Sequence, residues 1–307
     1  MTTDTPDAVL PATERRHPRS MAMESMSTRA ILELLNDEDR VAVAAARATL
    51  PALAHLVDAA ELRVRAGGRV HYFGAGTSGR LGVLDAAELV PTFGTDPSMV
   101  RAWIAGGEAA IVAAVEDSED SEESGRGLAL TEVGEADVVV GLTVSGTTPF
   151  VRGALEAARR AGALTAVITS NPATPLAAHC DHVIVAETGA EIVTGSTRLK
   201  AGTATKLLLN GFSTALMIRM GRTYSNLMVS VLATNEKLRQ RTLRILGEVT
   251  GASAPENARL LDRADGDLRV AVVSHLAAVP VETARAALSA ANGSVSEALG
   301  AFPAATP

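Results

Sequence analysis

Two turns rich in glycine and hydroxyl side chains each stand between an apolar strand-like run and a helix-like run, at 74–82 (GAGTSGRLG) and 145–149 (SGTTP). Backbone N–H groups and side-chain hydroxyls converge at a helix start, where the helix dipole is positive, and this arrangement suits a phosphate monoester. Ser and Thr at helix starts are also ordinary N-caps, but two such turns in one sheet favour a ligand. The positions expected to bind the phosphate and its sugar are Gly76, Thr77, Ser78, Ser145, Thr147 and Thr148.

A dinucleotide site is the alternative for the first turn, because Gly74, Gly76 and Gly79 reproduce the spacing G-x-G-x-x-G. Two features weigh against it. The hydroxyls of Thr77 and Ser78 stand inside the motif, and no acidic residue ends a second strand about 20 residues later, where a ribose hydroxyl requires one. A phosphate monoester therefore fits the turn better than a dinucleotide.

The elements that must position these turns alternate between strands and helices, which indicates a doubly wound, mainly parallel α/β domain at 60–223. Before it, 1–59 is expected to form an arm and helices, with 1–27 either disordered or ordered as an arm, and Pro51 starting or kinking a helix. After it, we expect a linking helix (224–250) and a small bundle of three short helices (251–307). The expected strands are 69–74, 99–106, 137–145, 164–170 and 182–187. The expected helices of the α/β domain and the linker are 78–89 (closed by Pro91), 107–115, 150–162, 198–220 and 226–247.

Composition narrows the class of protein. The 307 residues carry a net charge of −7, which disfavours a nucleic-acid groove because phosphate backbones select basic faces. No apolar run is long enough for a membrane span or a signal peptide. The single Cys180 excludes an intramolecular disulfide and fits a reducing cytoplasm. The six histidines show no metal spacing, so we expect neither a metal nor a cofactor.

Four long strings of the chain resemble the N-acetylmuramic acid 6-phosphate etherase family, whose fold is the sugar isomerase (SIS) domain. They are GAGTSGRLGVLDAAELVPTFG (74–94), IAGGEAAIVAAVEDSEDS (104–121), GAEIVTGSTRLKAGTATKLLLN (189–210) and NLMVSVLATNEKL (226–238). The resemblance covers nearly the whole chain and is shared with the glucokinase regulatory protein. It implies a cytoplasmic homodimer that cleaves a D-lactyl ether to give N-acetylglucosamine 6-phosphate in cell-wall sugar recycling.

Such a cleavage needs two carboxyl groups and no metal, because a base can take the proton on carbon 2 while an acid protonates the departing lactate oxygen. The resemblance assigns the acid to Glu88, in LDAAE, and the base to Glu119. The residues alone do not separate Glu119 from Glu116 or Asp120, because charge runs are usually solvated. Glu88 could likewise be a solvated helix position.

Further expectations concern the 194–202 segment, which offers Ser196, Thr197 and Lys200 at the start of a long helix. Ser196 and Lys200 are candidate substrate contacts, although Lys200 could equally form a structural salt bridge. Two positions depart from the family pattern. His17 stands where the family's T-E-x-x-N opening has Asn, and Thr147 stands where many members carry Arg or a longer polar residue. The rival functions are a phosphosugar isomerase, which needs no acid at carbon 3, and a non-catalytic phosphosugar sensor.

Overall fold

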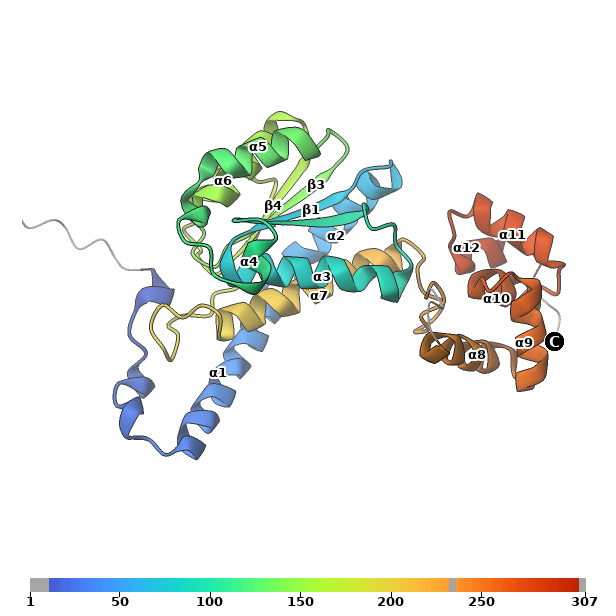
Figure 1. Ribbon diagram of the computed structural model, residues 1–307, viewed down its shortest axis with the longest axis horizontal. Helices are drawn as coiled ribbons and strands as arrows, with labels where there is room; N and C mark the ends of the chain where they lie inside the picture. Colours follow the sequence, from blue (N-terminus) through green and yellow to red (C-terminus); the bar gives the residue numbers. More distant parts are fainter. Residues whose placement is uncertain (1–10, 232–235, 304–307) are drawn as a thin grey trace, which may run out of the picture. The chain divides into compact units, whose positions relative to one another are not determined.

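A five-stranded parallel sheet forms the core of one compact unit of the computed structural model, which describes residues 11–231 and 236–303 (Figure 1). The strands are β1 (Val70–Gly74), β2 (Val100–Ile104), β3 (Val138–Leu142), β4 (Leu164–Thr169) and β5 (His182–Val185). They lie in the order β2-β1-β3-β4-β5, and each neighbouring pair is parallel. The predicted strands and the doubly wound α/β class are confirmed.

Helices cover both faces of this sheet, and alternate side chains of β1 show how. Tyr72 packs edge-on against Phe212 of α7 (Lys200–Arg219), with ring centroids 6.3 Å apart. The next residue, Phe73, points to the opposite face and contacts Phe150 of α6 (Pro149–Arg160), with centroids 6.1 Å apart. Helix α5 (Glu122–Glu132) packs on α6, while α2 (Leu50–Arg65) contacts β3, β4 and β5. A strand covered on both faces must be apolar throughout, as β3 is.

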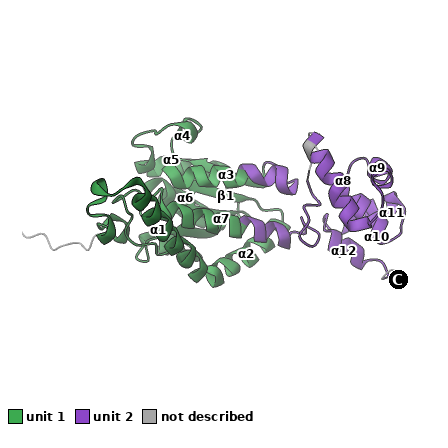
Figure 2. Ribbon diagram, turned by 90° about the horizontal axis from the view of Figure 1, so that it is seen from below, with its two compact units in different colours: residues 1–86, 98–212 green, residues 87–97, 213–307 purple. Residues whose placement is uncertain are grey.

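The chain divides into two compact units, 1–86 with 98–212 and 87–97 with 213–307 (Figure 2). The first unit contains the sheet together with α1 (Thr28–Ala48) and α2; α3 (Gly76–Phe93) and α7 contribute residues to both units. The second unit has its own apolar core, which includes Leu246, Ala271 and Val272. Its remaining helices are α8 (Glu236–Thr250), α9 (Ala254–Arg263), α10 (Leu268–Leu276), α11 (Val281–Ala290) and α12 (Val295–Gly300).

Several helices differ from the predicted ones. Pro91 does not close α3, which continues to Phe93 and ends at Gly94, where φ is +58° and the N–H donates to the Val90 carbonyl at 3.0 Å. A proline this close to a helix end removes only one of the last hydrogen bonds. The helix predicted at 107–115 is one turn, α4 (Ala109–Val112). The bundle's third predicted helix splits into α11 and α12, because Asn292 and Gly293 both have positive φ.

The helix predicted at 226–247 is wrong over its first part, because Tyr224 and Leu227 pair across a tight turn; α8 begins at Glu236, and 232–235 lie outside the described residues. Helix α5 is not among the predicted helices, because its first residues belong to the charge run 116–123 and such runs are usually solvated. The residues at its start are typical of a helix N-terminus. The Ser121 side chain accepts a hydrogen bond from the Ser124 N–H at 3.3 Å, and two glutamates occupy the first turn.

The N-terminal arm, residues 11–27, is ordered as three 3-10 turns, Ala12–Glu14, Pro18–Ser20 and Met23–Ser25, and the first ten residues lie outside the described part. Pro51 lies at the start of a new helix, α2, which is one of the two outcomes predicted for it. Among the described helices, no single one is both long and apolar enough to cross a membrane, and α1 with α2 passes on length and composition only as a pair bent by 54°.

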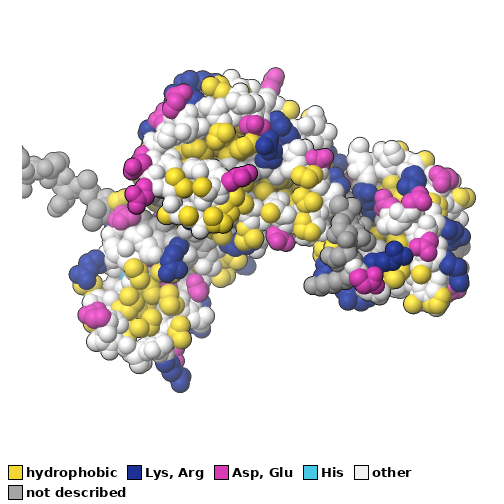
Figure 3. Space-filling model, in the orientation of Figure 1, with side chains coloured by type: hydrophobic (Ala, Val, Ile, Leu, Met, Phe, Trp, Pro, Cys, Tyr) yellow, Lys and Arg dark blue, Asp and Glu magenta, His cyan; other side chains and the backbone are white. Residues whose placement is uncertain are grey.

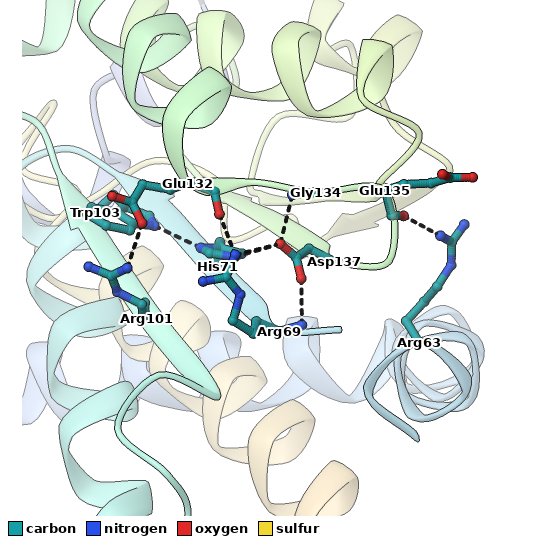
Figure 4. A network of polar contacts seen from close by, with 9 residues as sticks. All are labelled: Arg63, Arg69, His71, Arg101, Trp103, Glu132, Gly134, Glu135 and Asp137. Carbon is teal, nitrogen blue, oxygen red and sulfur yellow. Dashed lines mark hydrogen bonds and ion pairs between the residues drawn. The ribbon is translucent and has the colours of Figure 1, made fainter. Parts of the chain in front are cut away.

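A buried polar network ties β1 to the segment before β3, at the amino ends of the strands (Figure 4). Asp137, 4% exposed, accepts hydrogen bonds from the N–H groups of Arg69 (2.7 Å) and Gly134 (2.8 Å). Trp103 Nε1–H donates to His71 Nδ1 (3.0 Å), so the network assigns the His71 proton to Nε2, which faces Asp137 at 3.2 Å. Burial lowers the pKa of His71, which fits this neutral tautomer.

Replacing Asp137 tests this network. Burial alone would raise the pKa of Asp137, but the hydrogen bonds from Gly134 and Arg69 lower it overall. Asp137→Asn should reduce the free energy of unfolding by about 2–4 kcal/mol, since an amide N–H₂ would face those donors. Because the folded-state pKa is depressed, this stabilisation is present above pH ~4 and is lost as pH falls through the folded-state value. Urea unfolding at pH 7 and pH 3 measures both effects. Asp58→Asn, on the exposed face of α2, is the control and should change little.

Candidate active site

A pocket of about 290 Å³ opens at the carboxyl ends of β1 and β3, lined by residues that directly follow each strand. β1 and β3 are neighbours in the sheet, while β2, which comes between them in the chain, pairs with the other side of β1. The winding direction therefore reverses between β1 and β3. Open α/β sheets bind ligands at this switch point, because the connections leaving the two strands diverge and leave a crevice.

The β1–α3 turn depends on a close approach of strand and helix. A Cβ on Gly74 would lie 2.9 Å from Gly79 Cα, and a Cβ on Gly79 would lie 2.8 Å from the Gly74 carbonyl oxygen. Gly76 has φ +51° and begins α3. The glycine spacing thus serves strand-to-helix packing, and it leaves Gly76, Thr77 and Ser78 lining the pocket at the helix start.

The β3–α6 turn is held by a chain of hydroxyl hydrogen bonds. Thr143 Oγ1 lies 2.7 Å from Thr148 Oγ1 and accepts from the Gly146 N–H at 3.2 Å. Thr147 Oγ1 donates to Ser145 Oγ at 3.2 Å. From beyond β4, Thr174 Oγ1 donates to the Gly146 carbonyl at 2.6 Å. Ser145, Thr147 and Thr148 all line the pocket, so the two predicted turns are brought together.

Glu119 also lines this pocket, on the loop between β2 and α5. The loop closes because Asp117 adopts φ +59° and Ser118 Oγ donates to the Val115 carbonyl at 2.8 Å. Arg80 of α3 binds the same loop, donating to the carbonyls of Ile111 (3.1 Å) and Ala113 (2.8 Å). The loop is therefore fixed through its backbone, and the carboxylate of Glu119 is exposed at the pocket beside that of Asp120.

Glu88 does not line the pocket. It lies on α3 ten residues after Ser78, about 15 Å further along the helix at the usual rise per residue, and its side chain is exposed. Asp85, on the same helix, is 5% exposed and accepts a hydrogen bond from the Tyr72 hydroxyl at 2.9 Å. Within one chain, the structure brings Glu119 to the two turns and leaves Glu88 three helical turns away.

Of the 194–202 candidates, Ser196 and Lys200 do not line this pocket, whereas the intervening Thr197 does. Lys200 is 4% exposed and forms an ion pair with Glu38 of α1, with Nζ 2.5 Å from Oε2. Although burial alone would raise the pKa of Glu38, Lys200 and His17 lower it overall. Of the two roles considered for Lys200, the structure shows the salt bridge.

Glu14 of the N-terminal arm is a pocket residue that sequence reasoning missed. In the sequence, Glu14 is the Glu of the family's T-E-x-x-N opening, but this motif does not show where the residue lies in the folded chain. Among the described residues that line the pocket, none is Lys or Arg. An anion there would be bound by hydroxyls, backbone N–H groups and the N-terminal ends of α3 and α6.

Comparison with known proteins identifies the family. Residues 52–159 match the glucokinase regulatory protein N-terminal SIS domain, and 113–214 match the SIS domain. The chain is 53% identical to N-acetylmuramic acid 6-phosphate etherase of Thermobifida fusca (strain YX) over 85% of this chain and 86% of that protein. It belongs to the N-acetylmuramic acid 6-phosphate etherase family. The resemblance noted in the sequence is thereby confirmed.

A second etherase of this family, from Geobacillus thermodenitrificans (strain NG80-2), is 47% identical over 94% of this chain and 98% of its own length. Among solved structures, a phosphoheptose isomerase from Francisella tularensis is 18% identical over 62% of this chain and 98% of that chain, with a TM-score of 0.46.

Proposed function

We propose that this chain is a lyase that cleaves the D-lactyl ether of N-acetylmuramic acid 6-phosphate, giving N-acetylglucosamine 6-phosphate and D-lactate, in cytoplasmic recycling of cell-wall sugars. The observation that supports this proposal most is that one pocket is lined both by the two hydroxyl-rich turns and by Glu119. Incubation of the protein with that phosphosugar, followed by an assay for D-lactate, tests it. A protein that binds the phosphosugar and releases no lactate would be a sensor or an isomerase instead.

The chemistry follows from the substrate. An alkyl ether resists direct hydrolysis, but opening of the sugar ring exposes an aldehyde that acidifies the proton on carbon 2. In the elimination, a base removes this proton and the C3–O bond breaks as an acid protonates the lactate oxygen. In the second step, water adds at carbon 3 and a proton returns to carbon 2. Glu119 is the base and Glu88 the acid.

Glu88 serves the pocket of a second subunit in this proposal. Base and acid must reach neighbouring carbons of one sugar, yet Glu88 lies three turns of α3 away from its own chain's phosphate turn. One turn before Glu88 on the same face, Leu84 is 44% exposed. Apolar side chains gather elsewhere on the surface too (Figure 3), with Leu32 and Val43 of α1 60% and 56% exposed. A second copy covering Leu84 would bring Glu88 to the partner's sugar.

Removing hydroxyl donors tests the phosphate site. Ser78→Ala and Ser145→Ala each delete a hydrogen bond to a charged acceptor, worth about 1.5–3 kcal/mol. Each should therefore raise KM about tenfold or more, and the double variant more than either, while exposed Ser289→Ala should not. A double variant with the wild-type KM would place the phosphate elsewhere.

The acid and base roles separate in deuterated water. N-acetylglucosamine 6-phosphate carries the carbon 2 proton but no lactate, so a Glu88→Ala enzyme should exchange that proton while failing to release lactate from the substrate. Glu119→Ala should lose both activities. Each loss should be about 10²- to 10⁴-fold. The reverse pattern would exchange the two roles, and near-normal lactate release by both variants would exclude the pair.

Mixed dimers test where the pair is assembled. If Glu88 acts in the partner's pocket, a dimer of one Glu88→Ala chain and one Glu119→Ala chain keeps one complete site and about half the wild-type activity. The matched control pairs a wild-type chain with a chain carrying both substitutions, and it should be inactive. If both residues acted within one chain, the two dimers would show the opposite activities. Differently tagged chains allow each mixed dimer to be purified and assayed.

A further inference from the structure

We propose that Glu14 is a substrate-binding residue of this pocket, whose carboxylate accepts hydrogen bonds from the hydroxyl and amide N–H groups of the bound sugar. The inference rests on the proposed function and adds to it a part of the site that comes from outside the α/β core. It places the phosphate at the β1–α3 and β3–α6 turns, and the sugar on the side of the pocket where Glu14 and Glu119 lie.

Contacts on both sides of Glu14 fix its position. The preceding residue, Thr13, is 4% exposed, and its carbonyl accepts a hydrogen bond from the Gly195 N–H at 3.3 Å. Gly195 has φ +76°, and a Cβ there would lie 3.2 Å from Glu14 Oε2. The arm therefore lies directly on the segment that leads to Thr197 and α7. The Glu14 carboxylate lies next to Gly195, whose lack of a side chain leaves room for it.

Three residues later, a second contact holds the arm to the core. His17 is 8% exposed, and its Nε2 lies 3.1 Å from Oε1 of Glu38, whose other oxygen binds Lys200 at the start of α7. Next to it, Arg19 pairs with Asp37 at 2.8 Å. His17, which departs from the family's Asn, thus anchors the arm. The pocket that the arm reaches is its own chain's, because Glu14 and Ser78 of one chain line it together.

The carboxylate of Glu14 is available for a ligand. No residue that the structure describes forms a hydrogen bond or ion pair with it. It lines the same pocket as Ser78 and Ser145, where a carboxylate beside a bound phosphate would be repelled. An ionised carboxylate only accepts hydrogen bonds, and an amino sugar presents hydroxyl and amide donors. Glu14 therefore complements the sugar and not the phosphate.

Two ligands separate these contributions. Calorimetric titration with N-acetylglucosamine 6-phosphate should show about tenfold or greater weakening by Glu14→Gln and Glu14→Ala, since hydrogen bonds to a charged group are lost. Titration with inorganic phosphate should be unchanged in both variants and weakened in the Ser78→Ala, Ser145→Ala double variant. Glu24→Gln, an exposed acid of the same arm, is the matched control and should bind both ligands normally.

Three results would overturn the role of Glu14: unchanged phosphosugar binding in both variants, equal weakening of phosphosugar and phosphate binding, or a fall in kcat with unchanged phosphosugar binding, which would make Glu14 a proton-transfer group. Lactate release by the wild-type protein is measured separately. A wild-type protein that binds the phosphosugar through Glu14 but releases no lactate would refute the proposed function and leave this inference standing.

Discussion

The pairing of β1 with β3 is the constraint on which the site depends. Because β2 lies on the far side of β1, the two strands that carry hydroxyl turns become neighbours, although Gly74 and Leu142 are far apart in the chain. Their carboxyl ends then open into one crevice. The close contact of Gly74 with Gly79 starts α3 immediately at the strand end, so the first N–H groups of the helix lie beside the pocket. Sheet topology and one glycine contact together create the pocket in which we propose that the phosphate binds.

The proposed phosphate contacts and the acidic side chains of the pocket come from different parts of the chain. The hydroxyls belong to turns inside the α/β repeat, where the hydrogen bonds of Thr143 and Thr174 fix them. The acidic side chains that line the pocket lie on other segments, Glu119 on the loop between β2 and α5 and Glu14 on the N-terminal arm. Keeping the acids off the phosphate turns limits repulsion of a dianionic group.

The sequence sufficed for what local patterns encode. Strand β3 is apolar throughout because both its faces are covered, and Ser78 and Ser145 follow strands directly, so their meeting at one sheet edge was predictable. Glu119 required the family resemblance, since a charge run has no periodicity to single out one member. Glu14 was missed because its place depends on a tertiary contact with Gly195. The position of Glu88 was implicit in the predicted helix 78–89, because the ten residues from Ser78 to Glu88 span about 15 Å of α-helix.

The surroundings of the acidic side chains separate the proposed substrate-facing carboxylates from the buried, bonded ones. Asp85, Asp137 and Glu38 are buried and bonded to Tyr72 or to neighbouring cations and N–H groups, so each of these carboxylates already has a partner in the fold. Glu14 and Glu119 are exposed to the pocket, and the segments carrying them are held by backbone contacts. A group that must exchange protons or hydrogen bonds with a substrate has to be held without being neutralised. At both proposed positions the backbone is anchored, and no residue in the described part of the chain forms a hydrogen bond or ion pair with the carboxylate, which meets that requirement.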